Sequence, residues 1–326
     1  MTFRTARTSL LVFIFLLTCR LASGQEFYIN MGTSSDTKTS NSTYNWSVSY
    51  WEGLGEYAAM SLTYINEGHQ PNHYRDGLAP QIWGRLDLLD KRLSLAAGIG
   101  PYAYFSTDVS PVRDIYKDNH GLGLISSLAA TWCGASPLLF QVRANYIQTS
   151  RSFDSLSATF GIGYQLESSS TPGPASRPSP QYTRATDNEI ILYAGQTVLN
   201  SAKSEHGTTM SIEYRRGITP HLDWTVAWLD EGNARPIGRS GVATQIWAVR
   251  SFFDDHLVLG FGLGPYFARD KYSRDHGVKS TTAGLASLTA RCRFNKHWGI
   301  RAVWGRVITN YDRDTDIFVG GLSFLF

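Results

Sequence analysis

The chain has 326 residues, with 30 Lys and Arg against 27 Asp and Glu and a formal net charge of +3. Residues 1–25 hold three of the 30 basic residues and no acid, so the remainder carries 27 of each sign. It lacks the basic surplus that neutralises nucleic-acid phosphates, and no nucleic-acid partner is expected. A mean hydropathy of −0.20 and 17% charged residues exclude a bundle of apolar membrane-spanning helices.

The first predicted element is a secretory signal peptide at residues 1–25. Arg4 and Arg7 form its basic start, residues 9–18 form an apolar core, and Ala22-Ser23-Gly24 offers a small-residue cleavage site. The sequence therefore predicts an exported protein.

The rest of the chain is an internal duplication. Residues 50–104 match residues 214–268 at a constant shift of 164, and the shift becomes 160 in the later part of each repeat. The pairs include Glu67 with Glu231, Arg75 with Arg239, Gln81 with Gln245, Trp83 with Trp247, Gly98 with Gly262, Asp154 with Asp314, and Leu166 with the final Phe326. This pattern predicts two equivalent units, 26–166 and 189–326, joined by a Ser/Pro-rich linker at 167–188.

Each unit is predicted to contain eight strands that alternate apolar and polar residues. Several approach the roughly 9–11 residues that a tilted membrane strand needs. The expected strands are 26–36, 43–53, 57–68, 78–89, 93–106, 122–133, 138–149 and 155–166 in the first unit. In the second they are 189–200, 207–217, 222–232, 242–253, 257–269, 281–294, 299–310 and 317–326.

Three features favour an all-β transmembrane antiparallel up-and-down barrel over a soluble sandwich. Short turns such as 90–92 follow even-numbered strands, whereas longer polar loops such as 70–77 and 108–121 follow odd-numbered ones. The chain ends in residues 322–326, which resemble the terminal strand of bacterial outer-membrane proteins with its final Phe. Aromatic residues gather at strand ends, where membrane-interface girdles lie: Tyr44, Trp46, Tyr50, Trp51, Trp224 and Trp228.

These features predict location in the bacterial outer membrane. The expected partners are outer-membrane lipids and lipopolysaccharide, together with the barrel-assembly machinery, which would engage the strand that ends at Phe326.

Sixteen strands could close as two small barrels or as one barrel of porin size. Large side chains such as Trp83 and Trp247 match glycines such as Gly98 and Gly262 on the neighbouring strands, and an eight-stranded barrel has an interior that side chains fill in this way. The linker also favours two tandem eight-stranded units, with a single sixteen-stranded barrel as the alternative.

One constellation of chemical groups stands out at residues 66–77. His69, His73, Glu67 and Asp76 supply two imidazoles and two carboxylates, enough for a general base and its orienting acid, and Arg75 adds a cation. The second repeat keeps Glu231 and Arg239 but has neither histidine nor the second acid.

Two interpretations of this constellation remain open. In one, Glu67 with Arg75 and Glu231 with Arg239 form rim pairs that order a loop and bind lipopolysaccharide phosphate. In the other, the first repeat is catalytic through its histidines and the second is a degenerate copy. A metal site from His69, His73 and His120 is not predicted because spacing within a loop fixes no ligand geometry. No cofactor is expected.

The first repeat resembles the small outer-membrane lipid A deacylases, which are eight-stranded barrels that remove an acyl chain from lipopolysaccharide. The similar stretches are 95–100, 121–123 and Val142-Arg143-Ala144. The resemblance implies the fold and the compartment. The family's catalytic His-x-Ser pair would follow the last stretch, where this chain has residues 145–149 and no such pair.

The sequence therefore predicts an outer-membrane barrel protein with a structural, adhesive or surface-binding role for its external loops. One alternative is a lipid A or phospholipid acyl hydrolase in the first repeat. The other is a passive sixteen-stranded pore.

Overall fold

The computed structural model describes residues 23–110, 116–166, 187–201, 203–232, 237–271 and 278–326. Most of the predicted signal peptide and most of the predicted linker lie outside these ranges. In the described part of the chain, no helix is long and apolar enough to cross a membrane.

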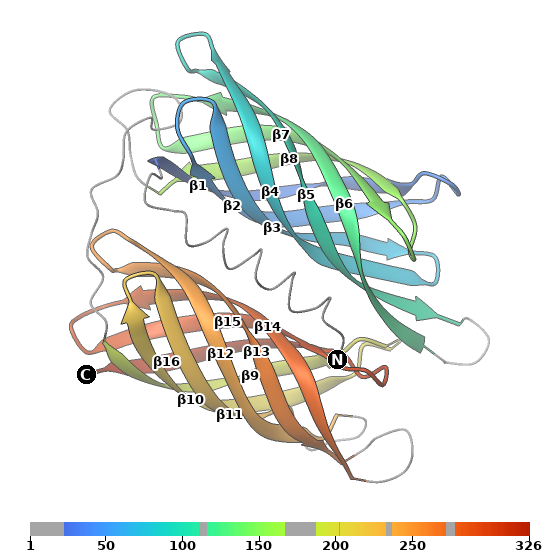
Figure 1. Ribbon diagram of the computed structural model, residues 1–326, viewed down its shortest axis with the longest axis vertical. Coiled ribbons are helices and arrows are strands. Elements are labelled where there is room, and N and C mark those ends of the chain that lie inside the picture. Colours follow the sequence, from blue (N-terminus) through green and yellow to red (C-terminus); the bar gives the residue numbers. More distant parts are fainter. Residues whose placement is uncertain (1–22, 111–115, 167–186, 202, 233–236, 272–277) are drawn as a thin grey trace. The chain divides into compact units, whose positions relative to one another are not determined.

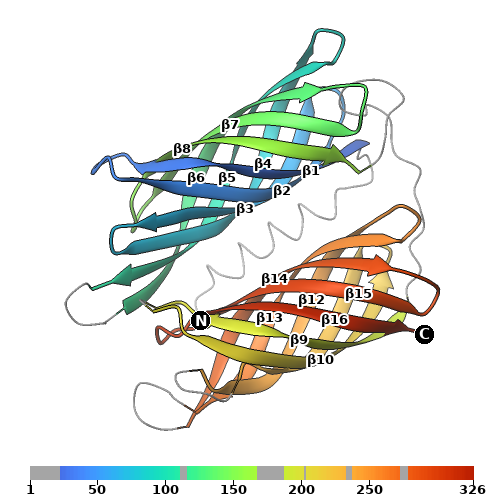
Figure 2. The same ribbon diagram turned by 180° about the vertical axis from the view of Figure 1, so that it is seen from behind.

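The described residues form sixteen antiparallel strands in two closed eight-stranded barrels (Figures 1 and 2). Barrel 1 contains β1 (Ser23–Asp36), β2 (Ser42–Gly53), β3 (Ala58–Gln70), β4 (His73–Leu88), β5 (Leu93–Val109), β6 (Tyr116–Cys133), β7 (Leu138–Thr149) and β8 (Ser155–Gln165). Barrel 2 contains β9 (Asn188–Leu199), β10 (His206–Thr219), β11 (Leu222–Asp230), β12 (Arg239–Phe252), β13 (Leu257–Asp270), β14 (Lys279–Arg293), β15 (Trp298–Ile308) and β16 (Thr315–Leu325). The prediction of two tandem eight-stranded units is confirmed, and the sandwich and the single sixteen-stranded barrel are wrong.

Each barrel runs up and down, because neighbours in the sheet are also neighbours in sequence. The seam of barrel 1 pairs β1 with β8, with Met31 opposite Phe160. The seam of barrel 2 pairs β9 with β16, with Gly195 opposite Val319. Successive side chains of a strand point to opposite faces, so each strand has an interior and an exterior face.

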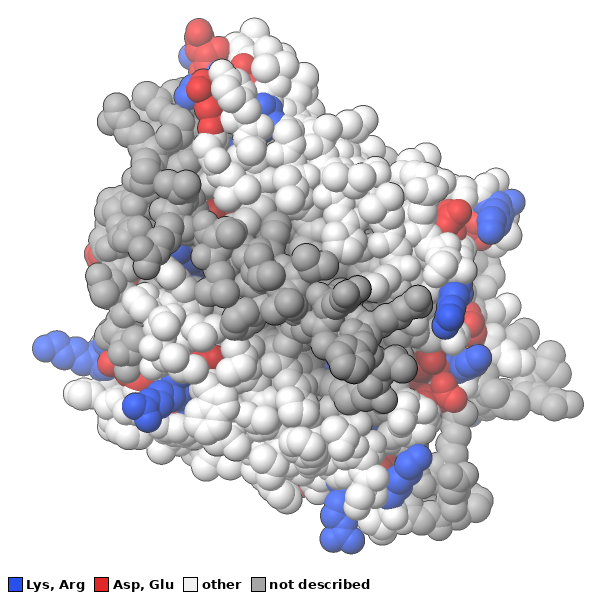
Figure 3. Space-filling view, in the orientation of Figure 1, with Lys and Arg blue, Asp and Glu red and all other residues white. Residues whose placement is uncertain are grey.

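Polar and small side chains face the interior and apolar side chains face outward. In β8, Ser157 and Thr159 are buried inside, whereas Phe160 and Ile162 are exposed. Other exposed outward residues of barrel 1 are Ile82, Leu86, Leu128, Trp132, Phe140, Val142 and Leu156, and those of barrel 2 are Leu192, Met210, Ile212, Val242, Phe267, Ile300, Phe318 and Leu322. Figure 3 shows charged residues at the ends of the strands and few on the walls between.

Glycines on one strand make room for tryptophans on the next, as the sequence predicts. A Cβ atom on Gly98 would lie 2.4 Å from the Trp83 ring, and one on Gly262 would lie 2.4 Å from the Trp247 ring. The Trp83 indole donates a hydrogen bond of 2.9 Å to Ser61, so the ring is both packed and satisfied. These interiors are packed with side chains.

The two ends of each barrel differ. Short turns close one end, here called the turn end, where Leu89, Asp90 and Lys91 adopt positive φ values in barrel 1 and Phe253, Asp254 and Asp255 do so in barrel 2. The opposite end, here called the loop end, carries the connections after odd-numbered strands.

Several details of the sequence prediction are wrong at the loop end of barrel 1. The segments 70–77 and 108–121 are not long loops, since β3 runs to Gln70, β4 begins at His73, β5 runs to Val109 and β6 begins at Tyr116. A hairpin that extends beyond an apolar band loses its apolar alternation because water meets both faces, yet its backbone pairing continues.

The prediction that Trp51 belongs to a girdle at the membrane interface is also wrong. It is 1% exposed, and its ring centroid lies 4.1 Å from that of Trp83 in the barrel interior.

Candidate functional site

Glu67 on β3 and Arg75 on β4 form a buried ion pair at the loop end of barrel 1. Nε and Nη2 of Arg75 donate to the two Glu67 carboxylate oxygens, with Nη2 2.8 Å from Oε1. Nη2 also donates to Ser155 Oγ at 2.9 Å, and Nη1 donates to the carbonyl oxygen of Phe153. The Tyr102 hydroxyl donates to Glu67 Oε2 at 3.0 Å. The pair therefore ties β3 and β4 to β5 and to the start of β8.

Barrel 2 contains the equivalent cluster. Arg239 Nε lies 2.6 Å from Glu231 Oε1, and Nη2 lies 2.8 Å from Oε2. Nη2 also donates to Thr315 Oγ1 at 2.7 Å, and Nη1 donates to the Arg313 carbonyl at 3.0 Å. All three guanidinium nitrogens of Arg75 and of Arg239 thus donate to oxygens of their own barrel, which fixes the loop end. A phosphate ligand for either arginine stays a prediction.

The other candidate catalytic residues do not converge on one point. Asp76 lies on the opposite face of β4 from Arg75 and accepts a 2.7 Å hydrogen bond from the Tyr64 hydroxyl. His69 is exposed, and its ring lies 4.3 Å from the Tyr74 ring. Neither has a described contact with His73.

His73 lies among groups that the sequence did not single out. It pairs in register with Asp108 of β5, and its Nδ1 contacts Asp108 Oδ1. Its Nε2 lies 2.8 Å from Ser106 Oγ and 3.2 Å from Ser152 Oγ. The second carboxylate oxygen of Asp108 accepts a 2.8 Å hydrogen bond from Asn119 of β6. The imidazole of His73 therefore contacts an acid through one ring nitrogen and two serine hydroxyls through the other.

The local electrostatics favour a neutral imidazole. Burial and the Arg75 cation lower the pKa of His73 below its ordinary value, although Asp108 and Glu67 act in the opposite direction. Arg75 Nη1 also lies 3.2 Å from Ser152 Oγ, so a positive charge stands beside that hydroxyl. The His73 side chain is 20% exposed, and Asp108 is half exposed.

Sequence reasoning missed Ser106, Asp108 and Ser152 for two reasons. Ser106 and Asp108 are two residues apart and therefore share a face of β5, but the sequence prediction ended this strand at residue 106. Ser152 lies in the β7–β8 connection, and only the closed barrel brings it to His73. A correct β4–β5 register would have identified Asp108, whereas Ser152 has no local signal.

The described residues contain no group of three or more His, Cys, Asp and Glu side chains arranged to hold a metal ion. His120 packs edge-on against Phe105, with ring centroids 5.9 Å apart. Cys133 and Cys292 are both free thiols.

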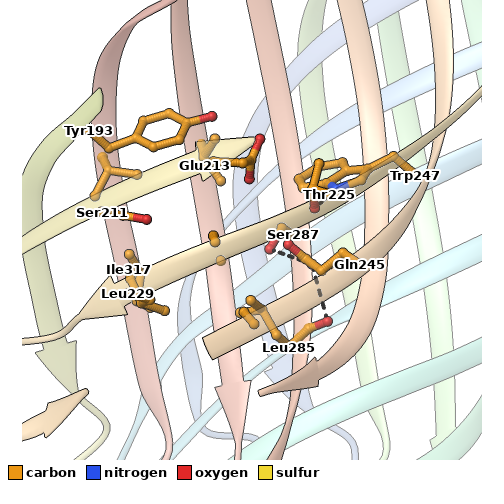
Figure 4. A pocket seen from close by; sticks show the side chains of 15 residues that line it. Tyr193, Ser211, Glu213, Thr225, Leu229, Gln245, Trp247, Leu285, Ser287 and Ile317 are labelled. Atoms are coloured by element: carbon orange, nitrogen blue, oxygen red, sulfur yellow. Dashed lines mark hydrogen bonds between the residues drawn. The ribbon is translucent and has the colours of Figure 1, made fainter. Parts of the chain in front are cut away.

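The interior of barrel 2 contains a partly open cavity of about 40 Å³. Its lining includes Tyr193, Glu213, Gln245, Trp247 and Val303, and Figure 4 shows the first four around it. A cavity with these polar groups is large enough for water.

No protein-family model matches the chain. A search of curated proteins also finds no match.

Solved structures similar to this chain are outer-membrane β-barrels. The N-terminal barrel domain of Pseudomonas aeruginosa OprF has 9% identity and a TM-score of 0.35, covering 44% of this chain and 98% of that one. Neisserial surface protein A has 12% identity, the same coverage and a TM-score of 0.35. The translocator domain of NalP from Neisseria meningitidis has 12% identity and a TM-score of 0.20, covering 99% of this chain and 98% of that one. The fold assignment rests on the strand pairing of this chain itself.

Proposed function

We propose that this chain is an integral protein of the bacterial outer membrane, in which two filled, non-conducting barrels hold their loop ends at the surface for a structural or binding role. The observation that carries the proposal is the exposed apolar outer face of closed barrels. Closed barrels satisfy every strand edge internally, as a hydrocarbon environment demands. A water-soluble protein rarely exposes apolar side chains in so continuous a pattern.

The packed interiors favour plugged barrels over pores. In barrel 1, Arg143 crosses the lumen and donates to Gln81 Oε1 at 2.5 Å and to Asn145 Oδ1 at 2.7 Å, and its guanidinium lies 5.0 Å from the Trp83 ring centroid. In barrel 2, Arg301 Nη2 lies 2.6 Å from Glu189 Oε2. Such filling is expected for eight-stranded barrels, whose interior is just wide enough for side chains, and it supports the proposal that the barrels do not conduct ions.

A lipid-facing charge tests the membrane assignment. Val142 lies on the outer face of β7 and is 58% exposed. We expect Val142→Arg to lower stability in phospholipid vesicles by about 2–4 kcal/mol, the cost of Arg on the lipid face of a barrel near the bilayer centre. The matched control is Phe253→Arg, because Phe253 is 48% exposed but lies in the β12–β13 turn.

Equal stability of the two variants in vesicles would contradict the membrane assignment. Fractionation of expressing bacteria supplies a second measurement: we expect the protein in the outer-membrane fraction, resistant to extraction by urea.

Planar-bilayer recording tests the non-conducting part of the proposal. We expect the purified, folded chain to give no steady conductance. Large, stable steps would favour a pore and contradict plugged barrels.

The partner proposal concerns the final strand. Phe318, Leu322 and Phe324 of β16 are exposed outward, and Phe326 is 56% exposed. We propose that the barrel-assembly machinery engages this strand, and we expect Phe326→Ala to slow the appearance of folded protein in cells while leaving refolding in detergent unchanged.

One alternative function has a specific observation in its favour. An acyl hydrolase in barrel 1, expected from the sequence as a second possibility, is favoured by the contacts of His73 with an acid and two serine hydroxyls.

A further inference from the structure

We propose that the loop end of barrel 1 contains a serine hydrolase centre for carboxylic acyl esters, in which Ser152 is the nucleophile, His73 the general base and Asp108 the residue that orients the base. The centre goes beyond the structural role proposed above. It uses neither His69 nor Asp76.

The Asp108–His73 contact fixes which imidazole nitrogen acts. Asp108 accepts from Nδ1, so the proton of the neutral ring resides there and Nε2 is the acceptor that faces the hydroxyls. Asn119 holds the other Asp108 oxygen at 2.8 Å, which keeps the carboxylate from rotating away. This is the nucleophile–base–orienter order that serine hydrolases share on unrelated folds.

Two serines face Nε2, and accessibility distinguishes them. Ser106 makes the shorter contact, 2.8 Å, but it is 4% exposed on β5. Ser152 is partly exposed, lies 3.2 Å from Nε2 and also lies 3.2 Å from Arg75 Nη1. A substrate carbonyl can approach Ser152 from the loop end, and contacts of the order of 3.2 Å suffice in a free enzyme because they tighten on substrate binding. We assign the buried Ser106 the role of positioning the imidazole ring.

The β7–β8 connection that carries Ser152 is held firmly. The Asp154 carboxylate accepts from the Thr149 backbone N–H at 2.8 Å, and Thr149 Oγ1 donates to the Phe153 carbonyl at 3.1 Å. The Phe153 ring lies 3.7 Å from the Arg75 guanidinium and 4.9 Å from the His73 ring. The nucleophile is therefore set on a fixed support, as precise catalysis requires.

The chemistry balances over two steps. Ser152 Oγ bonds to the ester carbonyl carbon while its proton passes to His73 Nε2. The carbon–alkoxy bond then breaks, and the same proton leaves with the alcohol. Water next attacks the acyl-serine, gives a proton to Nε2 and releases the carboxylic acid, and that proton returns to Ser152. Arg75 Nη1 lies 3.2 Å from Ser152 Oγ, so a cation stands beside the hydroxyl that gives up its proton.

Barrel 2 does not have this arrangement at the equivalent positions. Ile237 stands in place of His73, Asp270 in place of Ser106, and Asp312 in place of Ser152. Arg313 Nε lies 3.0 Å from Asp270 Oδ2, so an ion pair occupies the region. Barrel 2 is therefore an internal negative control.

The substrate class is an acyl ester, and its source follows from the proposed function. If the apolar outer band lies in a membrane, the centre opens at the lipid–water boundary, where ester groups of phospholipids and of lipopolysaccharide lie. Arg151, an exposed cation next to Ser152, suits an anionic headgroup. A soluble short-chain ester tests the chemistry without relying on the membrane assignment.

The decisive experiment labels the folded full chain in detergent micelles with a fluorophosphonate probe and maps the adduct by mass spectrometry. We expect a single adduct at Ser152, with labelling lowered at least about 100-fold in Ser152→Ala and in His73→Gln, the scale of a lost nucleophile or general base. Ser150→Ala, in the same connection, is the matched control and should label like the wild type. Heat-modified gel mobility verifies that each variant is folded.

Each other outcome overturns a defined part of the proposal. An adduct at Ser106 that survives Ser152→Ala would make Ser106 the nucleophile, and no adduct on folded protein would exclude the hydrolase centre. Turnover of p-nitrophenyl butyrate, of phospholipid in mixed micelles and of lipopolysaccharide then identifies the ester source. Cleavage of the soluble ester alone would uphold the centre but exclude the lipid assignment. Failure of the membrane proposal would instead be seen in the Val142→Arg comparison.

The pH profile tests the role of Asp108 separately from a structural role. The groups that face His73 are Asp108, Arg75 and Glu67, with Asp108 and Glu67 raising its pKa and Arg75 lowering it. Asp108→Asn removes a group that raises the pKa of His73. The acid limb of the pH–rate profile for ester hydrolysis should therefore move to lower pH, and the rate at the plateau should fall. An unchanged limb position would exclude Asp108 as the orienting residue.

Discussion

The two barrels share one framework but fill it differently. Both use a Trp over Gly pair and a buried Glu–Arg pair at the loop end. In barrel 1 the lumen is crossed by Arg143, whereas the equivalent position in barrel 2 is Val303, beside a cavity of about 40 Å³. The two barrels therefore share these packing and ion pairs, whereas side chains between the pairs differ.

The cavity has an identifiable origin. Thr63, Arg143 and Asn145 of barrel 1 correspond to Ala227, Val303 and Gly305 of barrel 2, and the latter three line the cavity. Each replacement is smaller and removes a polar group. Barrel 2 has further ion pairs on the other side of the cavity from Glu231 and Arg239: Arg215 Nη2 lies 3.0 Å from Glu213, and Arg291 Nη2 lies 2.9 Å from Asp255.

Removing the shared arginine should have the largest effect on stability, and the effect should be the same in both barrels. Arg75→Met and Arg239→Met each leave a buried carboxylate without its cation, which costs about 3–5 kcal/mol. Peptide-resolved hydrogen exchange across a urea series reads the two barrels separately. A large loss in one barrel and none in the other would show that the two pairs are not equivalent.

Removing the side chain that crosses the interior of barrel 1 should have an intermediate effect on stability. Arg143→Val reproduces the barrel 2 residue and leaves the buried Gln81 Oε1 without the donor it has in Arg143, whereas Asn145 Oδ1 keeps its hydrogen bond from Ser127 Oγ; the expected cost is roughly 1–3 kcal/mol. The same exchange measurement should show the loss in barrel 1 alone. A gain in stability would mean that the desolvation cost of the arginine exceeds the value of its hydrogen bonds.

Filling the cavity of barrel 2 should have a smaller effect of opposite sign. Val303→Met extends into the space beside Gln245, and cavity-filling substitutions commonly add roughly 0.5–2 kcal/mol. The matched control is Val226→Met on β11, whose side chain points away from the interior. If both variants behave alike, the cavity does not limit the stability of barrel 2.

The smallest difference concerns pH. Because burial lowers the pKa of His73 in the folded state, the unfolded chain binds that proton more readily, and stability falls as pH decreases through and below the ordinary histidine value of about 6.5. Barrel 2 has Ile237 at this position and no such contribution. His73→Gln should reduce the difference in the stability of barrel 1 between pH 5 and pH 7.5, measured by urea titration at each pH. An unchanged dependence would exclude this linkage.

The fold could be predicted from the sequence because alternation and duplication are local patterns. Trp83 facing Gly98 follows from residue size and strand order alone. The strand ends could not be placed, since the alternation fades where β4 and β5 extend to His73 and Asp108 with water on both faces. The residues of the candidate site were the hardest to predict. His73 could be identified from the sequence, but Ser152 is 79 residues from it and contacts it only because the barrel closes.

The seams have a consequence for biogenesis. The first and last strands of barrel 1 close on each other between residues 23 and 165, and the pairing of β1 with β8 requires nothing from the second half of the chain. Closure of each seam is its most sequence-distant contact and so the slow, ordering step of its folding. The first half of the chain therefore contains every strand that closes barrel 1, so closure of that barrel does not depend on the strands of barrel 2.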